Sequence, residues 1–221
     1  VSEGLPKDLR VNRVMINDGK VVLVSETMLY RSNSNAATTV WQSNPFYTIL
    51  NEPFLDIKMT NIFPGLSGNF ASSYEKGFFK EINNSGVWLP MHDNLKDKTV
   101  RAILEIADGT LFVGCESGLY KSANSGRSWK QVITGDGINS IAAVDGVLIT
   151  GTYKGIFRST DTGEHWEQIE TGDVGAYNIK CIEGAIVSIT DAGRWQDGNR
   201  DNRLRISTDQ GKTWQRIDEN L

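Results

Sequence analysis

The 221-residue sequence predicts an all-β fold, namely a β-propeller of about five four-stranded blades in a single domain over residues 1–221. Three observations predict it. A repeat of about 40 residues ends each time in tryptophan, short apolar runs alternate with tight-turn residues, and no helical period of useful length occurs. With 39% apolar and 23% charged residues, the chain has enough apolar side chains to build a core.

The repeat is clearest in three segments that align without gaps, at residues 119–129, 156–166 and 204–214. Each begins with an apolar strand end and continues with Ser, any residue, Asp or Asn, any residue, Gly, two residues and Trp. Two weaker copies, which have drifted in the turn, end at Trp41 and Trp88. Successive tryptophans are 37 to 48 residues apart, which is the length of a four-stranded blade.

Strands are predicted between the tryptophans, in order along the chain. In the first repeat, apolar runs at 11–17, 20–26 and 28–32 predict three strands. The last three repeats contain four runs each, at 101–107, 110–115, 119–123 and 128–133, at 140–144, 147–151, 156–160 and 165–169, and at 177–182, 185–189, 203–207 and 213–217. The blades are expected at about 6–45, 46–92, 93–134, 135–171 and 172–221.

An acidic residue followed by glycine predicts the tight turn between the first two strands of a blade, because glycine adopts positive φ at little steric cost. Four repeats contain such a pair: Asp18-Gly19, Asp108-Gly109, Asp145-Gly146 and Glu183-Gly184.

The residues that recur in the three clear segments are interpreted as structural. The Ser and Asp or Asn side chains can bond nearby backbone amides in the turn between the third and fourth strands, Gly supplies an unusual dihedral, and Trp wedges between blades. These residues are Asn124, Gly126, Trp129, Asp161, Gly163, Trp166, Asp209, Gly211 and Trp214.

The two ends of the sequence have the same phase within the repeat. Residues 1–5 resemble residues 217–221, so the chain begins and ends just after a fourth strand. Two alternatives follow: a five-bladed ring that closes by packing alone, or a part of a longer propeller.

Segments such as 151–166, GTYKGIFRSTDTGEHW, resemble the Asp-box, or BNR, repeats of sialidase-like, sortilin-like and photosystem II assembly factor-like propellers. The resemblance covers nearly the whole chain. It implies the fold strongly and the function weakly, because members include glycosidases, receptor ectodomains and assembly factors. The sialidase Arg-Ile-Pro motif is missing; the nearest fragments, at 29–32 and 204–207, belong to predicted third strands.

Charge and composition exclude several function classes. A formal net charge of -4 and a pI near 5.3 argue against nucleic acid as a partner, and no apolar run is long enough for membrane insertion. Cys115 and Cys181 lie in apolar runs and are expected to be buried, with a disulfide or a reactive thiol as the alternative. His92 and His165 have no neighbours at metal-ligand spacing, so neither a metal nor another cofactor is expected.

Candidate binding residues are expected on the blade face that carries the loops between second and third strands. Most of these loops are short and include Glu116, Tyr153 and Lys154. The last repeat has an insertion at 191–203, a place where a rigid scaffold commonly carries function. Its candidate ligand-binding residues are Arg194, Trp195, Asp197, Arg200 and Arg203, which combine an aromatic platform with guanidinium donors.

Each unusual segment also has a plainer interpretation. The insertion can be a solvated loop whose Trp packs on a neighbouring blade, and its segment 197–201 only partly matches a calcium-binding loop. The Pro-rich and aromatic segment 41–69 is either a partner-binding surface or a long blade link with an extended hairpin.

The sequence therefore predicts a non-catalytic propeller that binds a protein or glycan partner, with no catalytic residue assigned. The resemblance implies an exported bacterial protein, located in the periplasm, at the cell surface or in the medium. A glycoside hydrolase with its two carboxylates on the loop face is the alternative, and a structural spacer is the third possibility. The oligomeric state stays open.

Overall fold

The computed structural model describes residues 4–11, 13–17, 20–25, 28–35, 38–45, 47–48, 59–73, 76–83, 85, 87–169, 171–196 and 199–219. The regular elements among them are strands, and none of the described segments is a helix long and apolar enough to cross a membrane. The chain divides into two compact units, residues 1–100 and 101–221, which are described in turn.

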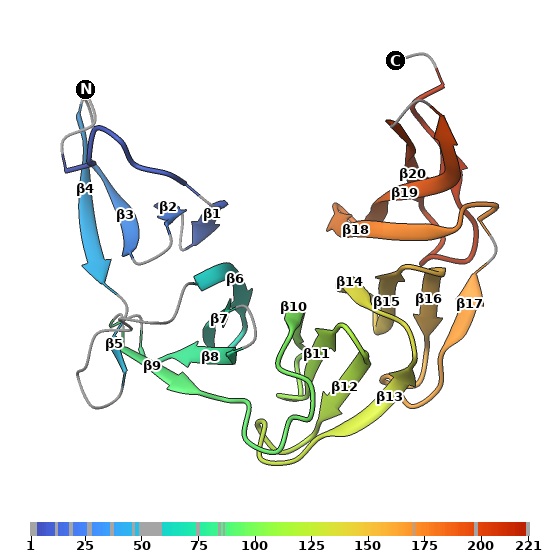
Figure 1. Ribbon diagram of the computed structural model, residues 1–221, viewed down its shortest axis with the longest axis horizontal. Coiled ribbons are helices and arrows are strands. Elements are labelled where there is room, and N and C mark those ends of the chain that lie inside the picture. The colour runs from blue at the N-terminus through green and yellow to red at the C-terminus, as the bar shows by residue number, and fades with distance from the viewer. Residues whose placement is uncertain are drawn as a thin grey trace. The chain divides into compact units, whose positions relative to one another are not determined.

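The first unit contains two sheets (Figure 1). The antiparallel sheet at the N-terminus has the order β1-β2-β3-β4, with β1 (Arg13–Asn17), β2 (Lys20–Val24), β3 (Met28–Asn35) and β4 (Thr38–Pro45). The other sheet has the order β5-β9-β8-β7-β6, with β5 (Tyr47–Thr48), β6 (Met59–Gly65), β7 (Gly68–Ser73), β8 (Gly77–Glu81) and β9 (Val87–Pro90). The short β5 pairs in parallel with β9 and is an addition that the repeat did not predict.

The second unit contains three four-stranded sheets, each in sequential order. They consist of β10 (Val100–Glu105), β11 (Leu111–Cys115), β12 (Gly118–Ser122) and β13 (Lys130–Thr134); of β14 (Ile138–Val144), β15 (Val147–Thr152), β16 (Gly155–Ser159) and β17 (Glu167–Ile169); and of β18 (Gly175–Ile182), β19 (Ala185–Gln196), β20 (Asn199–Ser207) and β21 (Gln215–Arg216). The predicted all-β architecture of about five four-stranded blades is thereby confirmed.

Two of the four predicted first-hairpin turns have two consecutive positive φ angles, whereas at Asp108-Gly109 only the glycine does. Asp145 and Gly146 have φ values of 47° and 80°, and Glu183 and Gly184 have 49° and 82°. Two consecutive positive φ angles are the mark of a two-residue type I′ turn, which matches the twist of the flanking strands. The corresponding Asp18-Gly19 lies outside the described residues.

Neighbouring sheets within each unit pack face to face, always in the same way. The outgoing face of the β14–β17 sheet, with Val147, Ile149 and Ile156, contacts the incoming face of the β18–β21 sheet, with Ile179 and Ile186. We use these two names for the equivalent faces of every sheet. Burial of such aliphatic side chains is the main stabilising contribution to the fold.

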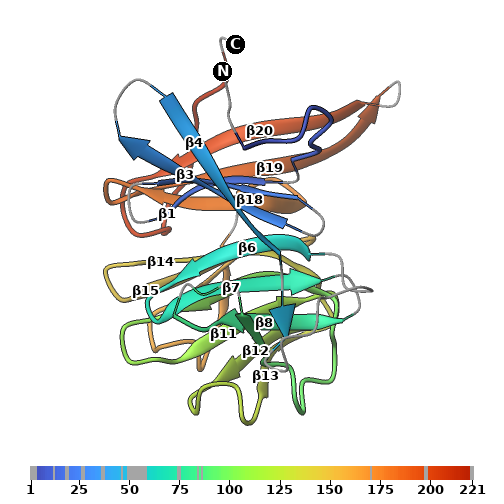
Figure 2. The same cartoon turned by 90° about the vertical axis from the view of Figure 1, so that its left-hand side faces the viewer.

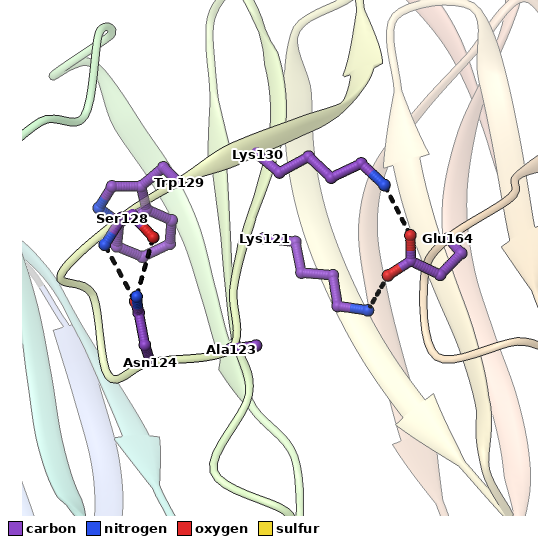
Figure 3. Close-up of a pocket in the computed structure, with 7 residues that line it drawn as sticks. All are labelled: Lys121, Ala123, Asn124, Ser128, Trp129, Lys130 and Glu164. Carbon is purple, nitrogen blue, oxygen red and sulfur yellow. Dashed lines mark hydrogen bonds and ion pairs between the residues drawn. The ribbon is translucent and has the colours of Figure 1, made fainter.

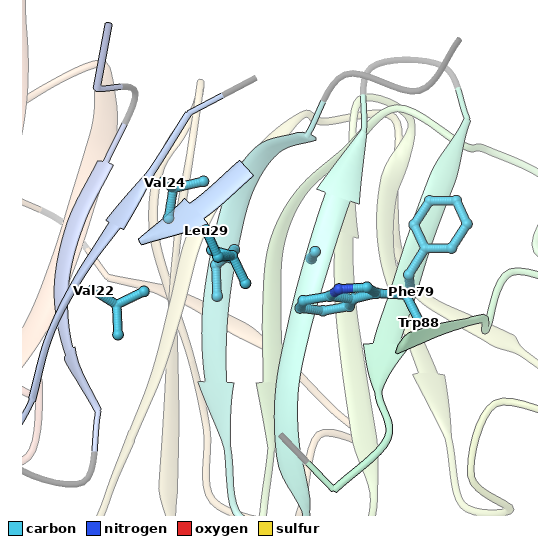
Figure 4. Packing of buried hydrophobic residues seen from close by; sticks show 7 residues of the cluster. Val22, Val24, Leu29, Phe79 and Trp88 are labelled. Carbon is cyan, nitrogen blue, oxygen red and sulfur yellow. The ribbon is translucent and has the colours of Figure 1, made fainter. Parts of the chain in front are cut away.

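The other two inter-sheet cores follow the same rule. Phe112 and Leu119 on the outgoing face of the β10–β13 sheet contact Leu148 on the incoming face of the next sheet. In the first unit, Val22, Val24 and Leu29 of the N-terminal sheet lie opposite Phe79 and Trp88 (Figure 4).

Polar contacts reinforce all three interfaces, including a bond of 2.8 Å from Nζ of Lys121 to the carbonyl of Thr162. Arg31 on an outgoing face forms an ion pair of 2.7 Å with the buried Glu81 of the next sheet. Arg158 holds the equivalent position in β16 of the β14–β17 sheet. Its Nε donates to the carbonyl of Gln210 at 2.9 Å. A basic side chain at this third-strand position thus links one sheet to the following one.

The two cysteines differ from the expectation that both are buried. Cys115 is fully buried in β11, whereas Cys181 near the end of β18 is exposed, and no disulfide joins them. The apolar run around Cys181 misled the prediction, because β18 has one covered face and reaches solvent at its end. Partial desolvation of the sulfur and the nearby Asp145 raise the pKa of the Cys181 thiol, against the effect of Lys180.

Candidate ligand-binding face

The second unit has two chemically different ends. At one end, short turns join second to third strands at 116–117 and 153–154, and links join successive sheets at 135–137 and 170–174. We call this end the loop face. At the other end lie the segments 123–129, 160–166 and 208–214, which join third to fourth strands. Because sheets of one order and hand are stacked here, equivalent loops of all three sheets share an end.

Arg101 organises the loop face. It lies in β10, and its guanidinium forms an ion pair with Glu116. Nη1 of Arg101 also donates to Oδ1 of Asn139 at 3.2 Å and to the hydroxyl of Tyr153, whose ring centroid is 5.3 Å from the guanidinium carbon. We call these four residues the Arg101 cluster.

The cluster brings together two predicted candidates, Glu116 and Tyr153, through a residue that the sequence analysis missed. Arg101 immediately follows a blade link, and that position was its only signal. Tyr153 is 43% exposed, and its ring is supported by the backbone of Gly137, where an added Cβ would lie 2.5 Å from the ring. A close backbone approach of this kind keeps the ring in place.

Lys154, the third predicted candidate, has a local role. Its Nζ donates to the carbonyl of Gly135 at 3.0 Å and so fastens the link between two sheets to the turn beside Tyr153. The side chain is exposed, so the ammonium group still contributes positive charge to this surface.

Asp136 in the same link is a buried acid. Oδ2 of Asp136 has no hydrogen-bond partner among the described residues. A buried carboxylate oxygen that lacks a donor costs free energy unless water or a ligand supplies one. The link beside Tyr153 therefore contains an unsatisfied acceptor.

Asp173, the counterpart of Asp136 in the next link, is fully satisfied. Its Oδ1 accepts from Nη1 of Arg203 at 3.0 Å, and its Oδ2 accepts from Oγ1 of Thr190 at 2.6 Å and from Nε of Arg205. Arg203, which was predicted to bind a ligand, is thus part of an internal ion pair with Asp173. Because both oxygens of Asp173 are bound, this acid anchors the β17–β18 link to β19 and β20.

The predicted insertion is a hairpin and not a loop. β19 and β20 continue past the end of β18, with Trp195 and Arg200 as register partners (Figure 2). Gly193, with φ of 72°, and its polar neighbours favour a loop in the sequence, but the pairing only shifts in register between Asp191 and Trp195 and then continues. Asp197 itself lies outside the described residues, as do the side chains of Arg194, Trp195 and Arg200. Asn199 to Asp201 belong to β20, so this half of the suggested cation loop is a strand.

The three turns at the opposite end have the same internal hydrogen bonds. In the last one, Ser207 Oγ donates to Asp209 Oδ1 at 2.8 Å, the amide of Gly211 donates to Ser207 Oγ at 2.9 Å, and the amide of Thr213 donates to Asp209 Oδ1 at 2.9 Å. Asn124 and Asp161 occupy the place of Asp209 in the other two turns and accept equivalent bonds.

The glycines and tryptophans of these turns also have similar roles. Gly126, Gly163 and Gly211 have φ of 83°, 80° and 80°. Nε1 of Trp166 donates to Gly163 at 3.2 Å, and Nε1 of Trp214 to Gly211 at 3.1 Å. Trp166 and Trp214 pack on the two inter-sheet cores. Trp166 and Trp214 thus bind their own turn, as do the Asp or Asn side chains; Trp129 instead lines a pocket at this end.

A shallow pocket of about 270 Å³ lies at the turn end, lined by Lys121, Ala123, Asn124, Ser128, Trp129, Lys130 and Glu164 (Figure 3). Glu164 accepts from Lys121 at 2.5 Å and from Lys130 at 2.7 Å. These two ammonium groups lower the pKa of Glu164 to about 2. The pocket therefore keeps one net positive charge, because the two lysines face a single carboxylate.

No family model and no curated protein sequence matches the chain. Solved structures do match. An ancestral GH74 enzyme superposes with a TM-score of 0.70 at 14% identity, over 96% of this chain and 31% of that one. The extracellular domain of the one-component system BT4673 from B. thetaiotaomicron has a TM-score of 0.67 at 15% identity, over 96% of this chain and 30% of that one.

YCF48 from Cyanidioschyzon merolae is also similar, with a TM-score of 0.60 at 16% identity over 86% of this chain and 69% of that one. The chain spans about a third of the length of the first two structures. At these identities the likeness concerns architecture alone. Together with the five sheets, it shows that the chain has a β-propeller fold.

Proposed function

We propose that the chain is a non-catalytic binding module and that the loop face of its second unit binds a glycan. The observation that carries the proposal is the Arg101 cluster. It holds an exposed aromatic ring, a guanidinium group, a carboxylate and an amide side by side at the surface. Sugars offer apolar C–H faces and outward hydroxyls, and a site with one aromatic platform and a few fixed polar groups suits both.

The buried Asp136 supports the same ligand class. A hydroxyl group can both donate to a carboxylate and accept from a guanidinium or amide group. A sugar placed on Tyr153 would have acceptors for Arg101, and its hydroxyls would reach the buried Oδ2 of Asp136 only if the link moved. Buried polar groups left without a partner favour ligands that complete them.

A glycosidase is the competing function, and a GH74 enzyme among the similar structures keeps it worth testing. Glycoside hydrolysis needs two carboxyl groups, one of them protonated, on either side of the scissile bond. Of the three acids described on the loop face, Asp173 has both oxygens engaged in the fold and Glu116 is paired with Arg101, so only Asp136 has an unsatisfied oxygen and the second carboxyl group is missing. This arrangement favours binding over turnover.

We also propose that the chain belongs to the Asp-box propellers and that the protein is exported. The three turns with the Ser, Asp or Asn, Gly and Trp pattern support membership of the Asp-box propellers. Export is supported by similar structures described as extracellular domains from B. thetaiotaomicron and as a bacterial surface component, PorZ, from Porphyromonas gingivalis. A glycan ligand is consistent with such a location.

The test is a glycan-array screen of the labelled chain, followed by calorimetric titration of each hit. Tyr153→Ala and Glu116→Gln are expected to lose binding, because the first removes the platform and the second replaces the charged partner of Arg101. Lys212→Ala, which changes an exposed residue at the turn end, is the matched control and should bind like the wild type. Binding that survives both loop-face substitutions would contradict the proposed site.

Two further outcomes decide between the functions. Release of reducing sugar or of an aryl group from a bound glycan, lost in a carboxylate-to-amide variant, would show that the protein is a glycosidase and not a binding module. An empty array, with a protein captured by the wild type and lost by Tyr153→Ala, would assign the same surface to a protein partner.

A further inference from the structure

The pocket at the turn end of the second unit takes no part in the glycan site proposed for the loop face. Its volume is about 270 Å³, and it lies between the third-to-fourth-strand turns of the β10–β13 and β14–β17 sheets. Trp129 and Ser128 line one side, and Lys121, Lys130 and Glu164 line the other (Figure 3). A space of this size suits one small group such as a single sugar ring, since pockets for larger ligands begin at about 300 Å³.

The two lysines of the pocket have different roles. Lys121 is mostly buried and is used by the fold, because its Nζ donates both to Glu164 and to the carbonyl of Thr162 at 2.8 Å. Arg158 makes the equivalent bond to the following sheet. The side chain of Lys130 is 66% exposed, and Glu164 is its one acceptor among the described residues. An ammonium group has three donors, so Lys130 has two left for a ligand.

The charge on the Trp129 side of the pocket differs from that of the equivalent segments. Residues 119–134 contain three basic residues and no acid, whereas the equivalent residues 156–171 contain one arginine and four acids. Residues 204–219 have three residues of each sign. Of these three segments, the first alone therefore has a surplus of positive charge, and it attracts anions to the pocket.

Trp129 adds an aromatic surface to this charge. It lines the pocket beside Ser128. The Oγ of Ser128 accepts from Nδ2 of Asn124 at 2.8 Å, so its own hydrogen can be donated to a ligand. An aromatic ring, a hydroxyl and an ammonium group within one small pocket suit a sugar ring that carries a negative charge.

We propose that this pocket is a second binding site, which takes a uronic acid residue of an acidic glycan. The sugar ring lies on the indole of Trp129, and its carboxylate accepts from Nζ of Lys130. Glu164 competes with the ligand for the same ammonium group and so lowers the affinity. The site is at the opposite end of the unit from the Arg101 cluster and does not depend on the function proposed for that cluster.

Calorimetric titration of the whole chain with trigalacturonic acid tests the proposal. It is run in the wild type and in Tyr153→Ala, which lacks the aromatic platform of the loop face. Tyr153→Ala should bind the acid at one site and should not bind the neutral galactose trimer. Added NaCl should weaken the complex, because the ion pair with Lys130 is exposed.

Two substitutions in the pocket should change the affinity for trigalacturonic acid in opposite directions. Lys130→Ala should weaken binding about fivefold, as the loss of one exposed ion pair does. Glu164→Gln should strengthen it by a similar factor, because the competing charge is removed. A merely structural role of Glu164 would not give tighter binding.

Matched substitutions control for general effects of charge. Lys212→Ala removes a lysine and Glu219→Gln a carboxylate from exposed positions that do not line the pocket, so both should leave the affinity unchanged. Circular dichroism verifies the fold of every variant.

The proposal would be overturned if Tyr153→Ala did not bind trigalacturonic acid at low salt, if Lys130→Ala bound it like the wild type, or if Glu164→Gln bound it more weakly. Tighter binding of a triglutamate peptide, which has the same charge, would assign the pocket to a protein partner and would also overturn it. Because Tyr153→Ala removes only the loop-face site, the two proposals can fail separately.

Discussion

At the scale of residues, the turn at 207–214 shows how a carboxylate can stabilise a fold without being buried. The hydroxyl of Thr213, the amide of Thr213 and the hydroxyl of Ser207 all donate to Asp209. These bonds, first of all those from Thr213, lower the pKa of Asp209 from 3.8 to about 2. The ionised form is therefore favoured by the folded state.

A pH dependence follows for Asp209. A depressed folded-state pKa gives stability that is present above the unfolded value of 3.8 and is lost as the pH falls towards 2. Asp209→Asn should keep the turn, because Asn124 serves in the equivalent turn, but should lower the melting temperature at neutral pH. The melting difference from the wild type is expected to shrink between pH 4 and pH 2. A difference that stays constant across this range would assign the effect to something other than the charge.

Two glycines with nearly the same backbone form a matched pair. Gly109 and Gly163 have φ of 83° and 80°, but an added Cβ meets nothing within 4 Å at Gly109 and lies 2.5 Å from the ring of Phe112 at Gly163. Gly109→Ala should cost about 1 kcal/mol through the left-handed backbone alone. Gly163→Ala should cost ~1–3 kcal/mol more, because it also overpacks the core. Equal losses in denaturant unfolding would show that the ring moves away freely.

At the scale of elements, the sequence predicted the strands well because each obeys local rules. Alternating apolar residues and Asp-Gly turns placed β14 to β17 within a few residues of their observed bounds. No ranges were predicted for β4 or for β6 to β9, and two further elements were missed. The parallel strand β5 contains only two residues, and the β19–β20 extension has a mostly polar sequence.

The Arg101 cluster escaped prediction for a different reason. Its members come from β10, a second-to-third-strand turn of each of two sheets, and the start of β14. Such contacts depend on how sheets are stacked, and no spacing in the sequence encodes them. Glu116 and Tyr153 could be chosen because the repeat fixes which turns share an end, whereas Arg101 lies within a strand and offers no turn signal.

The anchor at the base of the β19–β20 hairpin gives a prediction for that element. Asp173→Ala leaves Arg203 and Arg205, both largely buried, without their carboxylate. The loss should be about 3–5 kcal/mol in urea unfolding, as for other broken buried pairs. Asp218→Ala, which breaks a more accessible pair with Arg216, is the control and should unfold close to the wild type. Faster amide exchange in β19 and β20 alone would localise the effect.

At the scale of the whole molecule, the division at residue 100 has a physical basis. Residues 101–221 contain two complete inter-sheet cores of their own. Repeat proteins derive stability from each unit and its nearest neighbours, so a stretch with two complete interfaces can hold together.

A fragment of residues 101–221 is therefore expected to fold cooperatively. Thiol labelling provides the readout, since Cys115 is buried and Cys181 is exposed. One thiol should react in the native fragment and two in denaturant, and reaction of Cys181 should accelerate with pH because the pKa of its thiol is raised. Rapid labelling of both thiols without denaturant would show that residues 1–100 are needed for folding.

The three turns between third and fourth strands satisfy their own hydrogen bonds within eight residues. The side chains at their remaining positions, such as Arg127, Glu164 and Lys212, are exposed and are not needed for the turn bonds, and Glu164 pairs with Lys121 and Lys130. Three variable sites thus sit on one rigid end of the second unit, each held by an invariant frame. This end could be randomised as a display surface for selecting new binders, while the opposite end keeps the proposed glycan site.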